Sequence, residues 1–351
     1  MQLPTVPPRA TRERDLITLG EAMVLLLAEP GVPVTEASSF RRLVAGSESN
    51  VAIALARLGY RVGFAGRVGA DAFGTVVRRA IRGEGVDTSR LRGDDGAPTG
   101  VLVRDARPGH ATEVLYLRAG SAGSRLAPGD VDDDYVASAR ILHVTGITPA
   151  LSTTAADATY RAADAARGAG MVVTLDPNVR RRLGPLEQTL GRIRPLIRRA
   201  DVVLAGRDEA IALTGTPDAE AAAHRLLGAG PRLVVIKDGA NGSTAYDGTD
   251  VLPVPAASAV LVDPVGAGDA YAAGFIDGLL RGTDVAAALH GGTALGALAV
   301  GAAGDVEGLP HGPIPVPDGP ATAGAAAGTD PPKDIGPLKD NDPLKDIDVR
   351  R

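Results

Sequence analysis

Short runs of consecutive apolar residues alternate along the chain with longer segments in which apolar residues recur at helical spacing. Runs of four to eight apolar residues are typical of strands buried on both faces of a parallel sheet, because such strands have no solvent-facing side. The predicted strands lie at 16–20, 62–66, 141–146, 171–176, 201–206 and 232–239. The predicted Ala-rich helices lie near 153–168, 186–199, 219–229, 269–281 and 284–300. This alternation predicts an α/β domain whose parallel sheet is covered on both faces.

The first 120 residues interrupt this regular order. Residues 49–58 carry apolar residues at helical spacing and stop at Gly59, a common C-terminal signal. Residues 71–85 predict a second helix, with Asp71 as its N-cap. Between 98 and 120 the pattern alternates around a Pro-Gly turn, which predicts a hairpin. Because these hairpin residues break the strand–helix order, we expect them to form a small β appendage on the α/β domain.

The chain changes in character after residue 310. Pro, Gly and Ala dominate at first, and the motif PLKD then occurs twice, at 337–340 and 343–346. This segment has too few apolar residues to bury, so 311–351 is predicted to be a disordered tail.

Composition and charge exclude several classes of function. Aromatic residues make up 3% of the chain and Trp is absent, which argues against binding that depends on stacking against rings. The net charge of −5 argues against nucleic acid or an anionic membrane as partner. The chain has no Cys, and its five His residues show no metal-ligand spacing. No apolar run approaches the ~20 residues that span a bilayer, and no signal-peptide core is visible, so a cytoplasmic location is expected.

The clearest chemical signal lies at 261–275, with the sequence LVDPVGAGDAYAAGF. A short apolar strand is expected to lead into Gly266, Ala267 and Gly268, and an amphipathic helix is expected to follow. Small residues at a helix N-terminus let backbone N–H groups converge on an anion. An Asp beside an anion site would repel phosphate, so Asp269 is better suited to take a proton from an attacking hydroxyl. Together these features indicate phosphoryl transfer to an alcohol. The alternative is a tight turn with Asp269 as helix N-cap.

Two segments resemble the signatures of the ribokinase-like (PfkB) carbohydrate kinases. DPVGAGDAYAAGF, at 263–275, is similar to the C-terminal signature, and residues 45–74 are similar to the N-terminal one. Their order and separation match the family, and the resemblance covers residues 15–310. It implies a doubly wound α/β domain, mostly parallel and flanked by helices. It also implies a small β-sheet lid, with strands within about 21–40 and 97–120.

The resemblance implies a role for individual residues. Asp269 would be the base that deprotonates the sugar hydroxyl, and Gly266, Ala267 and Gly268 would form the anion hole. Gly46 and Asn50 would lie in the sugar pocket, although Asn50 could instead be a helix cap.

The same resemblance implies that ATP and Mg²⁺ are the cofactors. Lys237, Gly239 and Gly242 follow a predicted strand and match the family's nucleotide loop. Glu209 matches a Glu that is linked to Mg²⁺ through water. Gly206 stands where the family usually has Asn. That departure keeps a non-catalytic ligand-binding sensor open as an alternative.

Three further segments, at 18–24, 114–126 and 175–183, resemble 2-keto-3-deoxygluconate kinases in particular. The resemblance implies that Tyr116, Arg118 and Arg180 contact an acid sugar, and guanidinium groups suit a carboxylate because they bind it with two parallel bonds. The alternative is that Arg118 is a solvated residue of the lid and that Arg180 belongs to a surface run of basic residues at 180–182. Asn178 is also expected in this pocket, because it follows the end of a predicted strand. The expected substrate is 2-dehydro-3-deoxygluconate. A fructokinase, ribokinase or nucleoside kinase of the same fold remains the alternative, and the lid could support a homo-oligomer.

Overall fold

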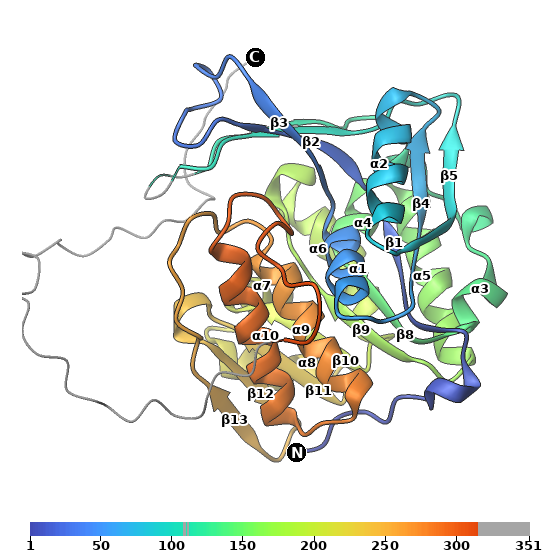
Figure 1. The fold of residues 1–351 in the computed structure, drawn as a ribbon. Coiled ribbons are helices and arrows are strands. Elements are labelled where there is room, and N and C mark those ends of the chain that lie inside the picture. The colour runs from blue at the N-terminus through green and yellow to red at the C-terminus, as the bar shows by residue number, and fades with distance from the viewer. Residues whose placement is uncertain (108–109, 111, 315–351) are drawn as a thin grey trace, which may run out of the picture.

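The computed structural model describes residues 1–107, 110 and 112–314, and the expected tail lies outside them from residue 315 onward. Nine strands form one large sheet in the order β13-β12-β11-β10-β9-β8-β1-β4-β5 (Figure 1). All neighbours from β11 to β5 are parallel, and the edge strands β12 and β13 are antiparallel. The strands are β1 (Arg14–Gly20), β4 (Val62–Gly69), β5 (Asp87–Asp94), β8 (Ala139–Thr145), β9 (Val172–Asp176), β10 (Val202–Gly206), β11 (Leu233–Lys237), β12 (Ser243–Tyr246) and β13 (Val251–Val254).

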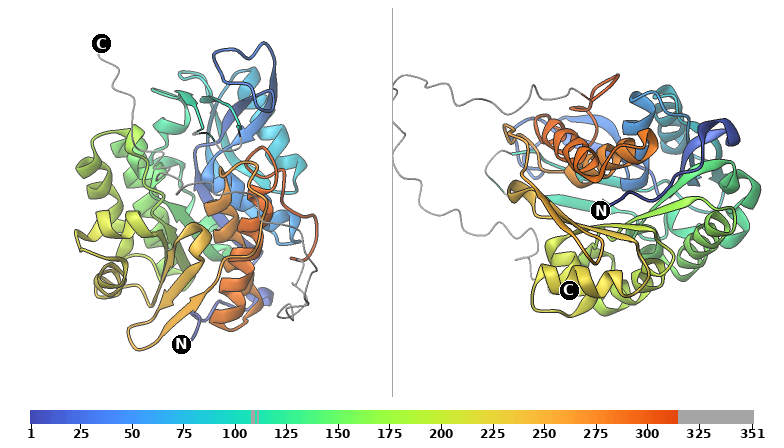
Figure 2. Two further views of the ribbon diagram at one scale, coloured as in Figure 1. Left: turned by 90° about the vertical axis from the view of Figure 1, so that its left-hand side faces the viewer. Right: turned by 90° about the horizontal axis from the view of Figure 1, so that it is seen from below.

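Helices cover both faces of this sheet (Figure 2). Neighbouring side chains on a strand point to opposite faces, so Leu16 of β1 packs into one core cluster and Ile17 into the other. The first face holds α1 (Ser47–Arg57), α2 (Ala72–Gly83), α9 (Ala267–Arg281) and α10 (Val285–Val300). The second face holds α3 (Asp133–Ala137), α4 (Ile147–Leu151), α5 (Thr153–Gly168), α6 (Leu186–Ile197), α7 (Arg207–Thr214) and α8 (Ala219–Leu227). Short 3-10 helices lie at Arg9–Thr11, Gly123–Arg125, Pro128–Asp130, Arg181–Leu183 and Gly239–Asn241.

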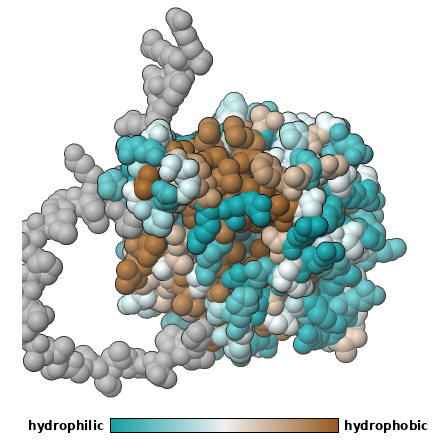
Figure 3. All heavy atoms as spheres, turned by 45° about the horizontal axis from the view of Figure 1, so that its top comes forward, coloured by the Kyte–Doolittle hydropathy of each residue, from teal (hydrophilic) through white to brown (hydrophobic). Residues whose placement is uncertain are grey.

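A second sheet of four strands, the lid sheet, projects from the domain above the ends of the large sheet (Figure 1). Its strand order is β3-β2-β6-β7. Its buried residues form a separate core cluster. Phe40, Leu115 and Leu117 are exposed instead. Hydrophobic residues gather on the lid side of the molecule (Figure 3). The strands are β2 (Met23–Ala28), β3 (Phe40–Ala45), β6 (Val101–Arg104) and β7 (Val114–Leu117), so β3 continues past the limit of residue 40 expected from the sequence.

The predicted buried strands and helices are confirmed with one exception, and the prediction missed three strands of the large sheet and the short helices α3, α4 and α7. The apolar strand expected immediately before Gly266 is absent, and Val260 and Leu261 are 79% and 56% exposed. Apolar composition was misleading there because no neighbouring strand is present to pair with the segment. The strands β5, β12 and β13 were missed because they lie near the sheet edges: polar residues interrupt the apolar pattern in β5 and β12, and β13 is only four residues long and contains Pro253. None of the helices in the described residues has the length and apolarity that a bilayer crossing requires.

Candidate active site

The site residues gather where the carboxyl ends of the central parallel strands meet the lid sheet. The chain runs outward from β1 through β4 to β5, then returns through β8 on the other side of β1. This change of direction leaves a crevice at the strand ends, which is where open α/β sheets bind ligands. β9 ends at Asp176 and β11 ends at Lys237, so both side chains reach this edge. The first turns of α1 and α9 point at the same place, as the contacts below show.

The turn into α9 depends on Gly266. Gly266 is the N-cap of α9 and has φ 84°, a conformation that a residue with a side chain rarely adopts. A Cβ atom there would also lie 2.3 Å from the carbonyl oxygen of Asp305. Ala267 and Gly268 begin the helix, and their N–H groups have no intrahelical acceptor. A Cβ on Gly268 would lie 3.7 Å from Lys237 Nζ, so this helix end has a positively charged neighbour.

Asp269 is not the N-cap of α9, because Gly266 occupies that position. Its buried carboxylate instead binds side chains from α1. Ser47 donates a hydrogen bond to Oδ1 at 2.6 Å, and Asn50 donates one to Oδ2 at 2.8 Å. Asn178, whose φ is 39°, contacts both Ser47 Oγ at 2.8 Å and Asp269 Oδ1 at 3.3 Å. Burial raises the pKa of Asp269 to about 7, although the bonds from Ser47 and Asn50 act to lower it. A carboxylate of this kind can accept a proton near neutral pH.

Lys237 forms an ion pair at the end of the sheet. Its Nζ lies 2.6 Å from Oδ2 of Asp176, and Asp176 Oδ1 accepts the backbone N–H of Asn178 at 3.1 Å. Burial acts to lower the pKa of Lys237, but the charges of Asp176 and Glu209 outweigh it and the pKa is raised. Lys237 therefore stays protonated beside the N-terminus of α9, as an anion site requires. Asp176 both positions the turn and pairs with Lys237.

Glu209 lies in the first turn of α7, but it is not a freely solvated side chain. Its Oε2 accepts the N–H of Gly206 at 2.8 Å, and its Oε1 accepts the N–H of Val179 at 2.9 Å. Burial raises its pKa, with the negative charge of Asp176 as the next cause. Within the described residues, no group of three or more His, Cys, Asp or Glu side chains is placed to hold a metal ion. Both oxygens of Glu209 keep lone pairs, which suits contact with Mg²⁺ through water and nucleotide phosphates.

The two glycines of the expected nucleotide loop differ in their surroundings. Gly239 has φ 52° and open space around it, at the carboxyl end of β11 next to Lys237. Gly242 has φ 93°, and a Cβ there would lie 2.1 Å from the carbonyl oxygen of Val254. Gly242 is therefore needed for the close approach of β13, whatever its part in binding a nucleotide.

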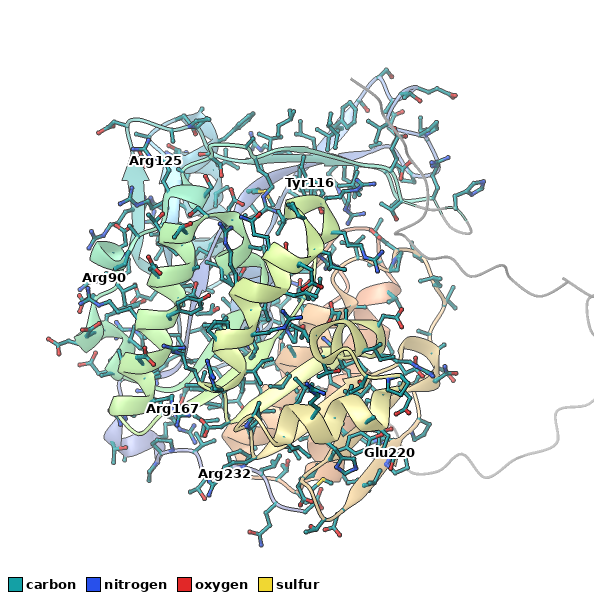
Figure 4. The ribbon with its side chains drawn as sticks, turned by 180° about the vertical axis from the view of Figure 1, so that it is seen from behind. Arg90, Tyr116, Arg125, Arg167, Glu220 and Arg232 are labelled. Carbon is teal, nitrogen blue, oxygen red and sulfur yellow. The ribbon has the colours of Figure 1, made fainter. Side chains whose placement is uncertain are left out.

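The expected sugar pocket brings together residues of the lid sheet, of the loop after β1 and of the first turns of α1. Arg118 binds the buried carboxylate of Glu21, with Nε 2.8 Å from Oε2, and its guanidinium lies 5.6 Å from the ring centre of Tyr116. Figure 4 shows Tyr116 on the lid strand. Gly46 packs so closely on the loop after β1 that a Cβ would lie 2.4 Å from the carbonyl oxygen of Glu21. Asn50 lies within α1 rather than at its N-cap, so the alternative of a helix cap is wrong.

Arg180 differs from Arg118 in having no acidic partner. It is exposed, and within the described part of the chain its guanidinium has no hydrogen bond or ion pair. Its charge nevertheless reaches the carboxylates of Asp269 and Glu209, whose pKa values it acts to lower. Arg180 is therefore a cation without a direct ion pair that lies close enough to the candidate base to interact with it electrostatically.

Sequence reasoning missed several residues of the site: Glu21, Ser47, Asp263 and Asp305. Glu21, Ser47 and Asp263 lie within motifs that were recognised, so they could have been found. No local pattern marks Asp305, because its contacts come from residues more than 200 positions away.

Known proteins resemble this chain over most of its length. The family described as "pfkB family carbohydrate kinase" matches residues 13–312. A 2-dehydro-3-deoxygluconokinase of Bacillus subtilis is 40% identical over 84% of this chain and 92% of its own. A 5-dehydro-2-deoxygluconokinase of Shouchella clausii is 33% identical over 85% of this chain and 93% of its own. Among solved structures, a PfkB protein from Polaromonas sp. JS666 has a TM-score of 0.77 at 39% identity, covering 85% of this chain and 97% of its own. A putative ribokinase II from E. coli in complex with ATP and Mg²⁺ has a TM-score of 0.78 at 24% identity. The match covers 84% of this chain and 96% of the ribokinase II chain.

Proposed function

Since the chain belongs to the pfkB family of carbohydrate kinases, we propose that it phosphorylates 2-dehydro-3-deoxygluconate on its terminal hydroxyl, giving the 6-phosphate. The observation that carries this proposal is the placement of Asp269, a buried carboxylate with a pKa of about 7, at the N-terminus of α9 and near Lys237. Asp269 can take a proton while the N-terminus of α9 and Lys237 attract a phosphoryl group.

In the proposed reaction, Asp269 accepts the proton of the terminal hydroxyl as its oxygen attacks the γ-phosphorus of ATP. A new phosphorus–oxygen bond forms in line with the bond that breaks, and ADP leaves. The free N–H groups of Ala267 and Gly268 stabilise the charge on the phosphoryl oxygens, and Lys237 adds its positive charge nearby. Bound Mg²⁺ would neutralise charge on the phosphates, and Glu209 would hold it through water.

A sugar acid is preferred over a neutral sugar because of Arg180. Its guanidinium has no carboxylate partner within the described residues, so it can bind the carboxylate of a substrate. Arg118 already shares its charge with Glu21, and Glu21 can also accept bonds from sugar hydroxyls. The second candidate substrate is 5-dehydro-2-deoxygluconate, on which the Shouchella clausii relative acts by name. It too has a carboxylate at one end and a hydroxyl at the other.

A coupled assay of ADP release with Mg-ATP tests the proposal. The panel contains both keto-deoxy acids, fructose, ribose and adenosine. We expect turnover with 2-dehydro-3-deoxygluconate, and we expect Arg180→Ala to raise the KM for the acid about 10- to 100-fold, since a bond to a charged group contributes roughly 1.5–3 kcal/mol. Arg118→Ala is a poorer test because it would leave Glu21 buried and unpaired.

The matched control is Arg181→Ala. Arg181 is the next residue and is also exposed, and the described residues offer it no hydrogen bond. Its loss should leave the KM unchanged. Turnover of 5-dehydro-2-deoxygluconate alone would select the second candidate, and preferential turnover of a neutral sugar would overturn the sugar-acid proposal. ATP binding without turnover of any substrate would favour the sensor.

The rate should depend on pH through Asp269. The base acts only when it is deprotonated, and burial raises its pKa to about 7. We therefore expect kcat/KM to fall about tenfold per pH unit below pH 7 and to level off above it, since this ratio reports the free enzyme. Asn50→Ala should move this limb to higher pH, because the bond from Asn50 favours the charged carboxylate. A profile that stays flat from pH 8 down to pH 5 would exclude Asp269 as the base.

A further inference from the structure

Arg104 is a fully buried arginine that the proposed reaction does not use. It ends lid strand β6, and its side chain is 1% exposed. Its Nη1 lies 2.7 Å from Oδ2 of Asp263, and its Nη2 lies 2.9 Å from Oδ1 of Asp305. Both carboxylates are also buried. One cation from the lid sheet is thus held between two carboxylates that flank the turn into α9.

Asp263 connects Arg104 to the candidate anion hole. Its Oδ1 accepts the backbone N–H of Val265, the residue before Gly266, at 3.1 Å. Its Oδ2, the oxygen that binds Arg104, also accepts the N–H of Gly304 at 3.1 Å. The position of this carboxylate therefore determines the path of the chain into Gly266.

Asp305 connects Arg104 to the candidate base. Its Oδ2 accepts a hydrogen bond from Asn50 at 3.2 Å, and the same amide nitrogen donates to Asp269 at 2.8 Å. The carbonyl oxygen of Asp305 lies directly against Gly266, where no Cβ would fit. A chain of contacts thus runs from Arg104 through Asp305 and Asn50 to Asp269.

Stability alone does not account for this arrangement. Apolar residues of similar volume commonly replace buried ion pairs without loss of stability, because desolvation offsets most of the attraction. The Nε of Arg104 is also buried without a partner, which adds to the cost. Directional hydrogen bonds from Arg104 fix the positions of Asp263 and Asp305, which an apolar cluster would not do.

We propose that Arg104 is a positioning residue for phosphoryl transfer, which holds the turn at Gly266 and the Asn50–Asp269 pair in their reactive places. This inference rests on the proposed kinase activity. It assigns to Arg104 the link between the lid sheet and the residues of phosphoryl transfer. Arg104 contacts the carboxylates on the far side of Asn50 and Gly266, and it does not have to touch the sugar or the base. Its loss should therefore lower kcat and leave the KM for the sugar acid nearly unchanged.

The test measures kcat, KM and thermal unfolding for Arg104→Ala and Arg104→Lys in the full chain. A displacement of about 1 Å can cost on the order of 10²-fold in rate, so we expect that loss of kcat for Arg104→Ala. The site left behind has two carboxylates and a space shaped for guanidinium. We expect guanidinium chloride at low millimolar concentration to restore kcat at least tenfold, and tetramethylammonium chloride at equal ionic strength to restore nothing. Arg104→Lys keeps the charge and should lose about tenfold.

Arg41→Ala is the matched control. Arg41 is also a lid arginine and donates to the carbonyl oxygen of Ala303 in the same loop, but it is exposed and binds neither carboxylate. Its kcat should stay within twofold of that of the wild type. Equal kcat in Arg104→Ala and wild type would overturn the inference, as would a loss that guanidinium does not restore in a folded variant. If Arg104→Ala does not fold, an Arg104→Lys variant with the wild-type kcat overturns it. An inactive wild type would instead reject the kinase proposal.

Discussion

Asp269→Asn should lower kcat by roughly 10²- to 10⁴-fold, the range that a positioned general base contributes. Asparagine has nearly the shape of aspartate, and its carbonyl oxygen can still accept the bond from Ser47. It cannot accept the proton of the attacking hydroxyl. The KM values for the sugar acid and for ATP should change by less than about threefold, since the removed interaction belongs to the transition state. The measurement is steady-state ADP release, with nucleotide binding checked by calorimetry.

Asp277→Asn is the matched control for this prediction. Asp277 is a buried aspartate on the same helix, two turns further on, where it accepts a hydrogen bond from Tyr60 at 2.7 Å. Its replacement removes a carboxylate from α9 without touching the site, so kcat should be unchanged. If Asp269→Asn kept more than a tenth of the wild-type kcat, another group would have to be the base.

Gly266→Ala should lower kcat by roughly 10²- to 10³-fold, as removal of one preorganised donor does. The methyl group meets the carbonyl oxygen of Asp305 at 2.3 Å, and the residue must hold φ 84°. Because neither demand can be met, the turn must shift and the N–H groups of Ala267 and Gly268 must turn away from the phosphoryl group. Steady-state rates and thermal unfolding of the purified variant measure the effect.

Gly282→Ala is the control that separates the backbone strain of a left-handed residue from the steric collision with Asp305. Gly282 lies at the other end of α9 with φ 67°, and nothing lies within 4 Å of its Cβ position. This variant should lose about 1 kcal/mol of unfolding free energy or somewhat more, because its backbone is left-handed, and should keep its kcat. If both variants lost activity equally, the collision with Asp305 would not be the cause.

Much of the large sheet could be predicted from the chain because its signal is local. An uninterrupted apolar run such as 202–205 is buried on both faces, whatever its neighbours are. The glycines before Asp269 likewise signal a turn into a helix through their own backbone freedom. The exposed residues 260–261 show the limit of this reasoning, since an apolar pair becomes a strand only if another strand lies beside it.

The partners of the site residues depend on contacts that no local pattern describes. Glu21 binds Arg118 across 97 positions, and Arg104 binds Asp305 across 201. These contacts decide which arginine can bind a substrate. Arg118 already pairs with the carboxylate of Glu21, whereas the guanidinium of Arg180 has no ion pair within the described residues.

The sequence thus determines the order of strands and helices and the identity of the chemical groups, because apolar periodicity and backbone freedom are properties of consecutive residues. The tertiary structure decides the proton affinity of Asp269 and the placement of the anion hole. Burial and electrostatic interaction depend on distances in space, and only the folded chain brings α1, α9 and the lid sheet together.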